Sequence, residues 1–438
     1  MRRLYILLMV SLFSFGRVDV WYSFRGVQYR GAITLSDLLF ASVFFLLIFK
    51  ILMTGTLIKI KLPIGISIPL ILFWVTLFFL PLFGIVIYNY DVNYMSTSLR
   101  HLQYFIILPI FMYSYNKIGD RRVILKDFAM ILLMAILLNG IYTFLQYLAL
   151  LKITDFHQFY PIRITRSGEE VAVGRAYGFF GEFSALGIFS SIVAIYFVCL
   201  EFYKKKVKLK FPSIYSITAI ILALFCLLVS GHRASIVGLF IVLTLFFVFN
   251  IRHTIAVLRK VGLVVCIFTV FLVSLSFTSK LNELVYIFDP GRINSIRIRF
   301  YSWSEFIGIY LNKFFPFGTL ASPSLVIPDM VADSAFMQVT LQGGILLLLF
   351  FLLLMICAGS ICWHKWLTSK NACDKMLFSF TFLFFVFSFT GALTQNLFTG
   401  SGFQTLFWSL IGTVSVFFSK NRTSSPLPNQ NRHHWFLI

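Results

Sequence analysis

The chain has 438 residues, of which 59% are hydrophobic and only 12% are charged. This composition excludes a soluble globular protein, because so few polar residues cannot cover a surface that faces water. The net charge of +21 would make nucleic acid a candidate partner of a soluble domain. Here the placement of Lys and Arg relative to a membrane accounts for most of that charge, so we expect no nucleic acid partner.

Apolar runs divide the whole chain into candidate membrane-spanning helices, which need roughly 20 residues each. They cover residues 4–15, 33–52, 64–87, 99–115, 123–151, 177–201, 211–230, 233–250, 261–279, 334–361, 376–398 and 402–419. The first run follows Arg2 and Arg3 and is as short as a signal-peptide core. Because no small-residue cleavage site follows it, we expect it to be retained. The predicted fold is an all-α bundle of about 12 transmembrane helices, forming one membrane domain over residues 1–438.

The short loops predict the orientation of this bundle. Most of the 37 Lys and Arg residues fall on one side if the N-terminus is cytoplasmic, and the polar tail 420–438 is then cytoplasmic too. The remaining basic residues are concentrated in two outer loops, 152–176 and 280–333, and at one helix end between them. This uneven placement on the outer side predicts a site for an anionic ligand. The six cysteines fall in helices or on the inner side, and no spacing predicts a metal site.

The second outer loop, 280–333, is far longer than the usual connection of roughly 4–6 residues. From Ser295 to Leu311 apolar residues recur at helical spacing, which predicts an amphipathic helix that lies on the membrane or caps a cavity. Its N-terminal end carries Arg292, Arg297 and Arg299. The alternative is an interfacial helix whose arginines contact lipid phosphates.

Arg233 is the strongest single candidate for a ligand-binding residue. It lies in Ser230-Gly231-His232-Arg233-Ala234-Ser235, a predicted outer hairpin between two apolar helices. The planar guanidinium matches phosphate oxygens and keeps its charge, so a fixed contact to a diphosphate is expected. The alternative is that Arg233 extends to lipid headgroups. His232 is either a proton carrier or a turn histidine that faces water.

Arg175 and Glu182 form a second candidate element. They are seven residues apart (182 − 175 = 7) in Gly174-Arg175-Ala176-Tyr177-Gly178-Phe179-Phe180-Gly181-Glu182, so both fall on one face of a helix that starts early enough. Glu182 would then lie inside an apolar span, where an ionisable residue is usually functional or paired. A structural ion pair between the two is the alternative. Arg163 and Arg166 add charge to the loop before them.

Asp333 stands at the start of the tenth predicted span and is followed by Ser334. One interpretation is an N-cap of that helix. The other is a general base that takes a proton from a sugar hydroxyl. Tyr301 and Trp303 in the loop before it are candidates for stacking on sugar rings, or else anchors at the membrane interface.

Three segments, in this order, resemble the superfamily of O-antigen polymerases and O-antigen ligases. Ser230-Gly231-His232-Arg233-Ala234 is similar to the family's Ser-Arg-Ala/Gly hairpin. Arg299-Phe300-Tyr301-Ser302-Trp303, followed by Pro316-Phe317-Gly318, resembles its Arg-x-x-x-Trp and Pro-x-x-Gly stretches. Asp333-Ser334 with Gly343-Gly344 stands where the family has His or Asp, then Asn or Ser, then a helix with Glu/Gln-x-Gly.

The resemblance implies a glycosyltransferase at the outer face of a bacterial inner membrane. Such an enzyme moves a glycan from undecaprenyl diphosphate to an acceptor hydroxyl without nucleotide, metal or other cofactor. It implies Arg175 and Arg233 as diphosphate ligands and Asp333 at the place of the catalytic His. Because the ligases typically have His there, a polymerase is the favoured member. The further substrate-binding candidates are Arg163, Arg166, His232, Glu182, Arg292, Arg297, Arg299, Tyr301 and Trp303.

The expected partners are a lipid-linked oligosaccharide, membrane lipids and a chain-length regulator. Two alternatives stay open. One is the O-antigen ligase, which transfers finished polymer to lipid A core. The other, from a different class, is a flippase or secondary transporter of an anionic lipid or solute, because basic cavities in helical bundles also serve transport.

Overall fold

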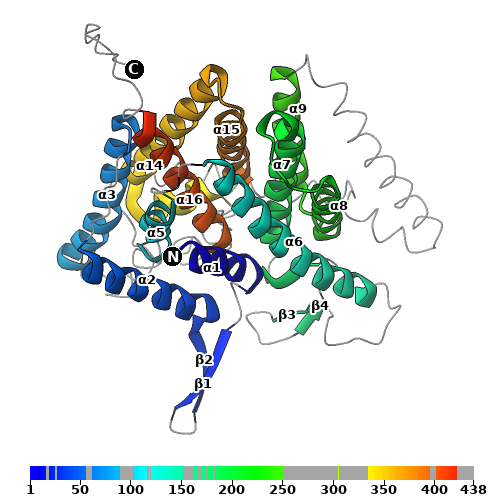
Figure 1. Ribbon diagram of the computed structural model, residues 1–438. Helices are drawn as coiled ribbons and strands as arrows, with labels where there is room; N and C mark the ends of the chain where they lie inside the picture. The colour runs from blue at the N-terminus through cyan, green and yellow to red at the C-terminus, as the bar shows by residue number, and fades with distance from the viewer. Residues whose placement is uncertain are drawn as a thin grey trace, which may run out of the picture.

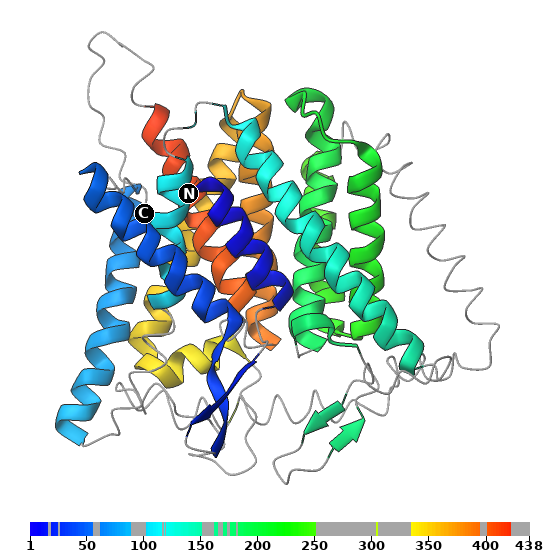
Figure 2. The ribbon, with the colours of Figure 1, turned by 60° about the horizontal axis from the view of Figure 1, so that its bottom comes forward.

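A computed structural model gives the fold. It describes residues 1–15, 19–24, 27–55, 62–88, 102–115, 118, 120–150, 162–164, 170–172, 176–180, 183–250, 304, 334–394 and 401–421. These residues form a bundle of helices with two short β-hairpins that project from the same end (Figure 1, Figure 2). Apart from Ser304, the predicted amphipathic helix in loop 280–333 lies outside the described residues, as do most of loop 152–176 and the tail after Asn421.

Helices make up nearly all of the described chain. The N-terminal half contributes α1 (Arg2–Phe15), α2 (Leu35–Thr54), α3 (Ile64–Tyr88), α5 (Ile107–Tyr115) and α6 (Arg122–Leu150). The rest of the chain contributes η3 (Gly178–Phe180), α7 (Phe183–Val207), α8 (Ser213–Ser230), α9 (Arg233–Phe249), α14 (Ala335–Thr368), α15 (Ala372–Thr394) and α16 (Ser401–Asn421). Eleven of the twelve predicted spans therefore coincide with helix. The remaining span, 261–279, lies outside the described residues.

Five of the described helices are long and apolar enough to cross a membrane. They cover Arg122–Ala149, Phe183–Val207, Ser213–Ser230, Gly343–Thr368 and Ala372–Ala392. Large apolar side chains such as Phe45, Phe79 and Phe240 are exposed on the outside of the bundle, an arrangement that suits lipid rather than water. The protein is therefore a multi-pass membrane protein. Five more predicted spans correspond to shorter apolar helices: Leu38–Thr54, Ile64–Phe79, Leu102–Tyr115, Arg233–Phe249 and Phe403–Phe417.

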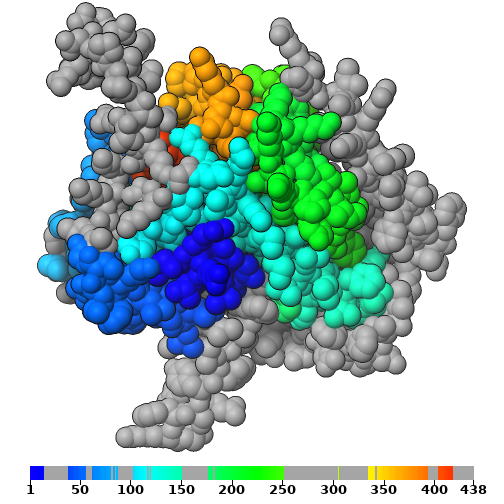
Figure 3. Space-filling view, viewed as in Figure 1, coloured from blue at the N-terminus to red at the C-terminus, as the bar shows by residue number. Residues whose placement is uncertain are grey.

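The centre of the bundle is α7, which packs against α8, α9 and α15. Its Tyr196 ring is fully buried and meets Phe380 of α15 edge to face, with ring centroids 4.9 Å apart. The Tyr196 hydroxyl donates a hydrogen bond to the carbonyl of Leu125 in α6. On one face of the molecule α1 lies between α2 and α6 (Figure 3). The bundle thus joins both halves of the chain around α7.

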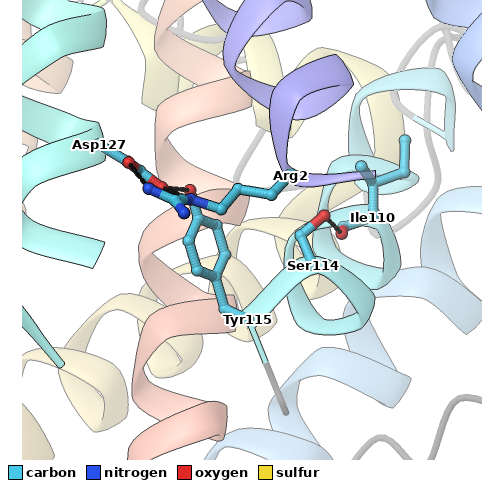
Figure 4. A network of polar contacts seen from close by, with 5 residues as sticks. All are labelled: Arg2, Ile110, Ser114, Tyr115 and Asp127. Carbon is cyan, nitrogen blue, oxygen red and sulfur yellow. Dashed lines mark hydrogen bonds and ion pairs between the residues drawn. The ribbon is translucent and has the colours of Figure 1, made fainter. Parts of the chain in front are cut away.

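Ion pairs join helices at the end of the bundle that the sequence predicts to be cytoplasmic. Arg2 of α1 makes a bidentate contact with Asp127 of α6, with N···O distances of 2.6 and 2.7 Å (Figure 4). The hydroxyl of Tyr115 donates a third hydrogen bond to the same carboxylate at 2.7 Å. Arg121 pairs with Asp374 at the start of α15. Each buried carboxylate therefore has a fixed cation beside it.

The all-α bundle is confirmed, and two short hairpins that the sequence did not predict are attached to it. β1 (Asp19–Phe24) pairs antiparallel with β2 (Val27–Thr34), and β3 (Ile162–Ile164) pairs antiparallel with β4 (Glu170–Ala172). Phe24 pairs with Val27, so only Arg25 and Gly26 separate the first two strands, and Gly is typical of such short turns. A search for long apolar runs detects helices and overlooks this short alternating pattern.

Glycines change two of the predicted helices. The span predicted from residue 177 begins as helix α7 only at Phe183, because Gly178 has a φ of +58° and the chain forms a short 3₁₀ turn there. The span predicted over 334–361 continues to Thr368 and is interrupted at Gly343 and Gly344. Gly344 has φ 69° and ψ −171°, a conformation that essentially only glycine adopts. Both irregularities lie near the end of the bundle that the sequence predicts to be outside.

Candidate functional site

The structure describes only part of the predicted site. Of the twelve candidate residues, His232 and Arg233 are described with their side chains, and Arg163 is described as a backbone position in β3, paired with Val171. The remaining nine lie outside the described residues: Arg166, Arg175, Glu182, Arg292, Arg297, Arg299, Tyr301, Trp303 and Asp333. The site can therefore be built upward from the α8–α9 hairpin and the elements that contact it.

The hairpin is as tight as the sequence predicts. α8 ends at Ser230, and α9 begins at Arg233, so Gly231 and His232 alone connect them. Gly231 has a left-handed φ of 59°, and its N–H donates to the carbonyl of Leu228 at 2.9 Å. This is a glycine C-cap, which allows the chain to reverse direction at once. The first turn of α9 is thereby placed directly beside the last turn of α8.

His232 points into the bundle. Only 6% of it is exposed, and its Nδ1 lies 2.5 Å from the Oγ of Ser235 in the first turn of α9. On the other side it faces Gly187 of α7, where an added Cβ would lie only 2.6 Å from the Cβ of His232. The interpretation of His232 as a turn histidine that faces water is therefore wrong. The imidazole fits between α7 and α9 because position 187 has no side chain.

Arg233 is the first residue of α9 and is half-buried at the end of the bundle. The N-terminus of a helix carries a partial positive charge from its unpaired N–H groups, and here the carbonyl of His232 already accepts from Ser235 and Ile236. The guanidinium and the helix end therefore add positive potential at the same place. An anionic group is favoured there on electrostatic grounds.

The segment that follows Arg175 is tied to this hairpin. The N–H of Ala176 donates to the carbonyl of Val229 in the last turn of α8, at 3.3 Å. Ala176 is fully buried, and it packs with Val229. Ala176, the residue after Arg175 in the chain, is therefore bound to the last turn of α8, which precedes the hairpin that carries Arg233.

Two amide side chains of α6 hold the same segment, and neither was predicted from the sequence. Oε1 of Gln146 accepts from the N–H groups of Tyr177 and Gly178 at 3.1 and 2.9 Å. Oδ1 of Asn139 accepts from the N–H of Phe179 at 3.1 Å. The signal that would have found them is the spacing of Asn139, Thr143 and Gln146, which places three polar residues on one face of an otherwise apolar helix.

The start of α14 corrects one interpretation of Asp333. The helix begins at Ala335, and its N-cap position is Ser334, so Asp333 precedes the cap. Ser334 is buried, and its hydroxyl donates to the carbonyl of Ala392 near the end of α15 at 2.8 Å. The hydroxyl therefore joins two helices and does not cap its own. The N-cap interpretation of Asp333 is wrong because the helix begins one residue later than that role requires.

The site as described is an arginine-bearing hairpin supported by buried polar groups. Within the described segments, no three His, Cys, Asp or Glu side chains come together in a way that could hold a metal ion. The chain matches none of the known protein-family models, and it matches none of the curated proteins. The fold and the site together define a class of protein. It is a multi-pass helical membrane protein with an arginine, Arg233, at its α8–α9 hairpin.

Proposed function

We propose that the protein is an O-antigen polymerase of a bacterial inner membrane, acting at its outer face. It transfers a glycan from undecaprenyl diphosphate to the terminal sugar hydroxyl of another lipid-linked repeat unit. The observation that carries the proposal is the half-buried Arg233 at a tight hairpin, with Ala176, the neighbour of Arg175, hydrogen-bonded to that hairpin at Val229. Arg233 and Arg175 are the proposed ligands of the two phosphates of the carrier, because a guanidinium binds phosphate oxygens in a planar, bidentate way.

The chemistry requires little beyond charge stabilisation and positioning. The bond between the anomeric carbon and the phosphate oxygen breaks, and undecaprenyl diphosphate leaves with the electron pair. The acceptor hydroxyl oxygen forms the new glycosidic bond and loses its proton to a base. Fixed arginines stabilise the charge on the departing diphosphate without reorganising. Asp333 is the proposed base, and such a base contributes about 10² to 10⁴ in rate.

The two outer loops are proposed to bind the glycan and its lipid carrier. Arg163 and Arg166 belong to the first loop, and Arg292, Arg297 and Arg299 to the second. Tyr301 and Trp303 are proposed to stack on sugar rings. A chain-length regulator and membrane lipids are the proposed partners. No metal is required, because the cationic groups of the chain supply the charge that a metal would otherwise bring.

Transport of an anionic lipid is the second candidate, and the interruption of α14 at Gly343 and Gly344 favours it. Discontinuous helices are typical of transporter binding sites, although those sites lie near the membrane centre, whereas the interruption of α14 lies near one end of the bundle. Transporters of charged substrates also place ionisable groups at that depth. Throughout the described helices, however, Asp, Glu, Lys and Arg lie within the first or last two turns. This distribution supports the polymerase over a transporter.

One reaction tests the proposal. Purified protein is mixed with lipid-linked repeat units, and the products are separated by length, with and without a chelator. We expect polymer in both samples. Movement of the substrate across a vesicle membrane without polymer would favour the transporter, and loss of polymer with chelator would contradict a metal-independent enzyme.

A deletion strain separates the polymerase from the ligase. The lipopolysaccharide of the strain is resolved on a gel. A single repeat on lipid A core identifies a polymerase. Absence of O-antigen from the core, with polymer left on the carrier lipid, identifies the ligase instead.

A further inference from the structure

The interior of α6 carries a stripe of three uncharged polar residues, Asn139, Thr143 and Gln146. All three side chains are fully buried. They follow one another at intervals of four and three residues, so they lie on one face of the helix. Amides are expensive to bury in a membrane protein unless their hydrogen-bonding groups are used. Their partners therefore indicate what the stripe is for.

Two of the three residues bind the backbone of the Tyr177–Phe179 turn. One oxygen of Gln146 accepts from two successive N–H groups, of Tyr177 and Gly178, and Asn139 accepts from the next one, of Phe179. Because all three contacts involve backbone N–H donors, the atoms that receive them must be the amide oxygens, which fixes the orientation of both side chains. Asn139 also donates to the carbonyls of Phe13 and Ala135. It is therefore held on both sides.

The turn itself has a conformation that needs this support. Gly178 has a φ of +58°, and an added Cβ there would lie 2.9 Å from Oδ1 of Asn139. The N–H groups of an irregular segment inside a bundle have no helical partners of their own. α6 supplies those partners as side-chain oxygens. The stripe thus fixes a turn that helix formation alone would not specify.

We propose that Asn139 and Gln146 are positioning residues that set the place of Arg175 by holding the turn that follows it. The inference rests on the proposed function, in which Arg175 binds the diphosphate. The turn is anchored at three points: to Gln146, to Asn139 and, through Ala176, to Val229 beside the Arg233 hairpin. Loss of the amide oxygens removes the contacts that hold Tyr177–Phe179, the described segment that follows Arg175 in the chain.

The test is a double-mutant cycle on ligand affinity. The probe is undecaprenyl diphosphate in detergent micelles, and the dissociation constant is measured for wild type, Gln146→Leu, Arg175→Ala and the double variant. Gln146→Leu leaves two N–H groups without an acceptor, so we expect affinity to fall about tenfold. In the Arg175→Ala background the same change should have less than a twofold effect, because the residue it positions is gone.

Matched variants separate positioning from general stability. Thr143→Val changes the third member of the stripe, whose buried hydroxyl has no hydrogen-bond partner among the described residues, and should bind like wild type. Gly178→Ala strains the same turn from the other side and should reproduce the loss, and it serves as the second probe if Gln146→Leu fails to fold. The melting temperature of each variant is recorded with its affinity.

The outcomes distinguish this inference from the proposed function. Equal weakening by Gln146→Leu in both backgrounds, or no weakening in either, overturns the positioning role. Loss of affinity in Arg233→Ala without any loss in Arg175→Ala overturns it as well, while the polymerase proposal stands. Unchanged affinity in Arg233→Ala would overturn the diphosphate site and, with it, the proposed function.

Discussion

At the scale of single residues, His232 and Arg233 are adjacent in the chain but enter different surroundings. His232 occupies the N-cap position of α9 with φ −84° and ψ 90°, which directs its ring between α7 and α9. Arg233 has helical geometry and remains half-buried at the end of the bundle. The surroundings suit each group, because an imidazole can be satisfied by the hydroxyl of Ser235 whereas a guanidinium always carries a charge.

The first prediction concerns Arg233→Lys. A lysine ammonium keeps the charge but cannot reproduce a planar, bidentate contact with phosphate oxygens. We expect polymer formation in vitro to fall at least tenfold while the amount of folded protein, measured by size-exclusion chromatography, is unchanged. Wild-type activity in the lysine variant would show that Arg233 contacts lipid headgroups and does not clamp a diphosphate.

The second prediction concerns the packing of His232. Gly187→Ala places a Cβ 2.6 Å from the Cβ of His232, and the backbone of neither helix can yield without moving its neighbours. We expect a loss of stability of about 1–3 kcal/mol, as is usual for overpacking, seen as a lower melting temperature in detergent. Gly65→Ala is the control, because its added Cβ would meet only Ile361, at 3.7 Å. Equal melting temperatures for the two variants would contradict the close contact.

At this scale the sequence marked candidate residues chiefly by their charge. Arg233 was predictable because a guanidinium at the end of an apolar run is costly without an anion. The burial of His232 was not, because it depends on Gly187 in a different helix. The roles of Asn139 and Gln146 were not predicted, because an uncharged amide barely interrupts an apolar run. Their oxygens accept from backbone N–H groups of Gly178 and Phe179, which lie far along the chain.

At the scale of helices, α1 is joined to α6 by a charged contact, which is the subject of the third prediction. Asp127→Ala removes the partner of both Arg2 and Tyr115 (Figure 4). The side chain of Asp127 is 5% exposed but that of Arg2 is 44% exposed, so solvent screens part of the interaction. We expect a loss of about 1–2 kcal/mol, measured by thermal unfolding in detergent.

Arg122→Gln is the control for the Asp127 variant. Arg122 and Asp120 are 3.9 Å apart, and both are more than half exposed. Such surface pairs contribute little, so this variant should unfold at the wild-type temperature. If both variants unfold like wild type, the contact between α1 and α6 does not stabilise the bundle.

The fourth prediction concerns the interruption of α14. Gly344→Ala forces a side chain into φ 69° and ψ −171°, so we expect a loss of stability of about 1–3 kcal/mol and of polymer formation. Gly359→Ala in the same helix is the control, because its added Cβ would only touch Phe385 at 3.9 Å and alanine favours helix. That variant should be as stable as wild type or more so. A Gly344→Ala protein with unchanged stability and activity would show that the interruption is not required.

The sequence predicted those helices best whose apolar runs are long. Runs such as 64–87 and 211–230 are long and uniformly apolar, and α3 and α8 match them closely. The start of α7 was placed too early because Gly178 and its partners on α6 determine a turn inside an apolar run. The break in α14 was missed for a similar reason, since two adjacent glycines are compatible with either a straight or an interrupted helix.

At the scale of the whole molecule, the ion pairs between helices and the irregular backbone lie at opposite ends of the bundle. The pairs of Arg2 with Asp127 and of Arg121 with Asp374 join the ends of α1, α6 and α15. The two β-hairpins and the α8–α9 hairpin lie at the other end, since α1 runs from Arg2 toward β1 and α6 runs from Arg122 toward β3 (Figure 2). The proposed reaction thus belongs to the end opposite the ion pairs.

The fifth prediction is the orientation of this bundle in the membrane. A reporter enzyme that is active only outside the cytoplasm is fused after Gln28, Arg163 or Trp303, or after Lys370 or Lys420. We expect activity for the first three fusions and none for the last two, because the Lys and Arg of the short loops favour the cytoplasmic side. Gln28 and Arg163 lie in hairpins that project from the same end, so their fusions must agree with each other whatever the orientation. Disagreement between these two would contradict the fold, whereas activity after Lys420 would reverse the orientation and remove the site from the side where the proposed reaction occurs.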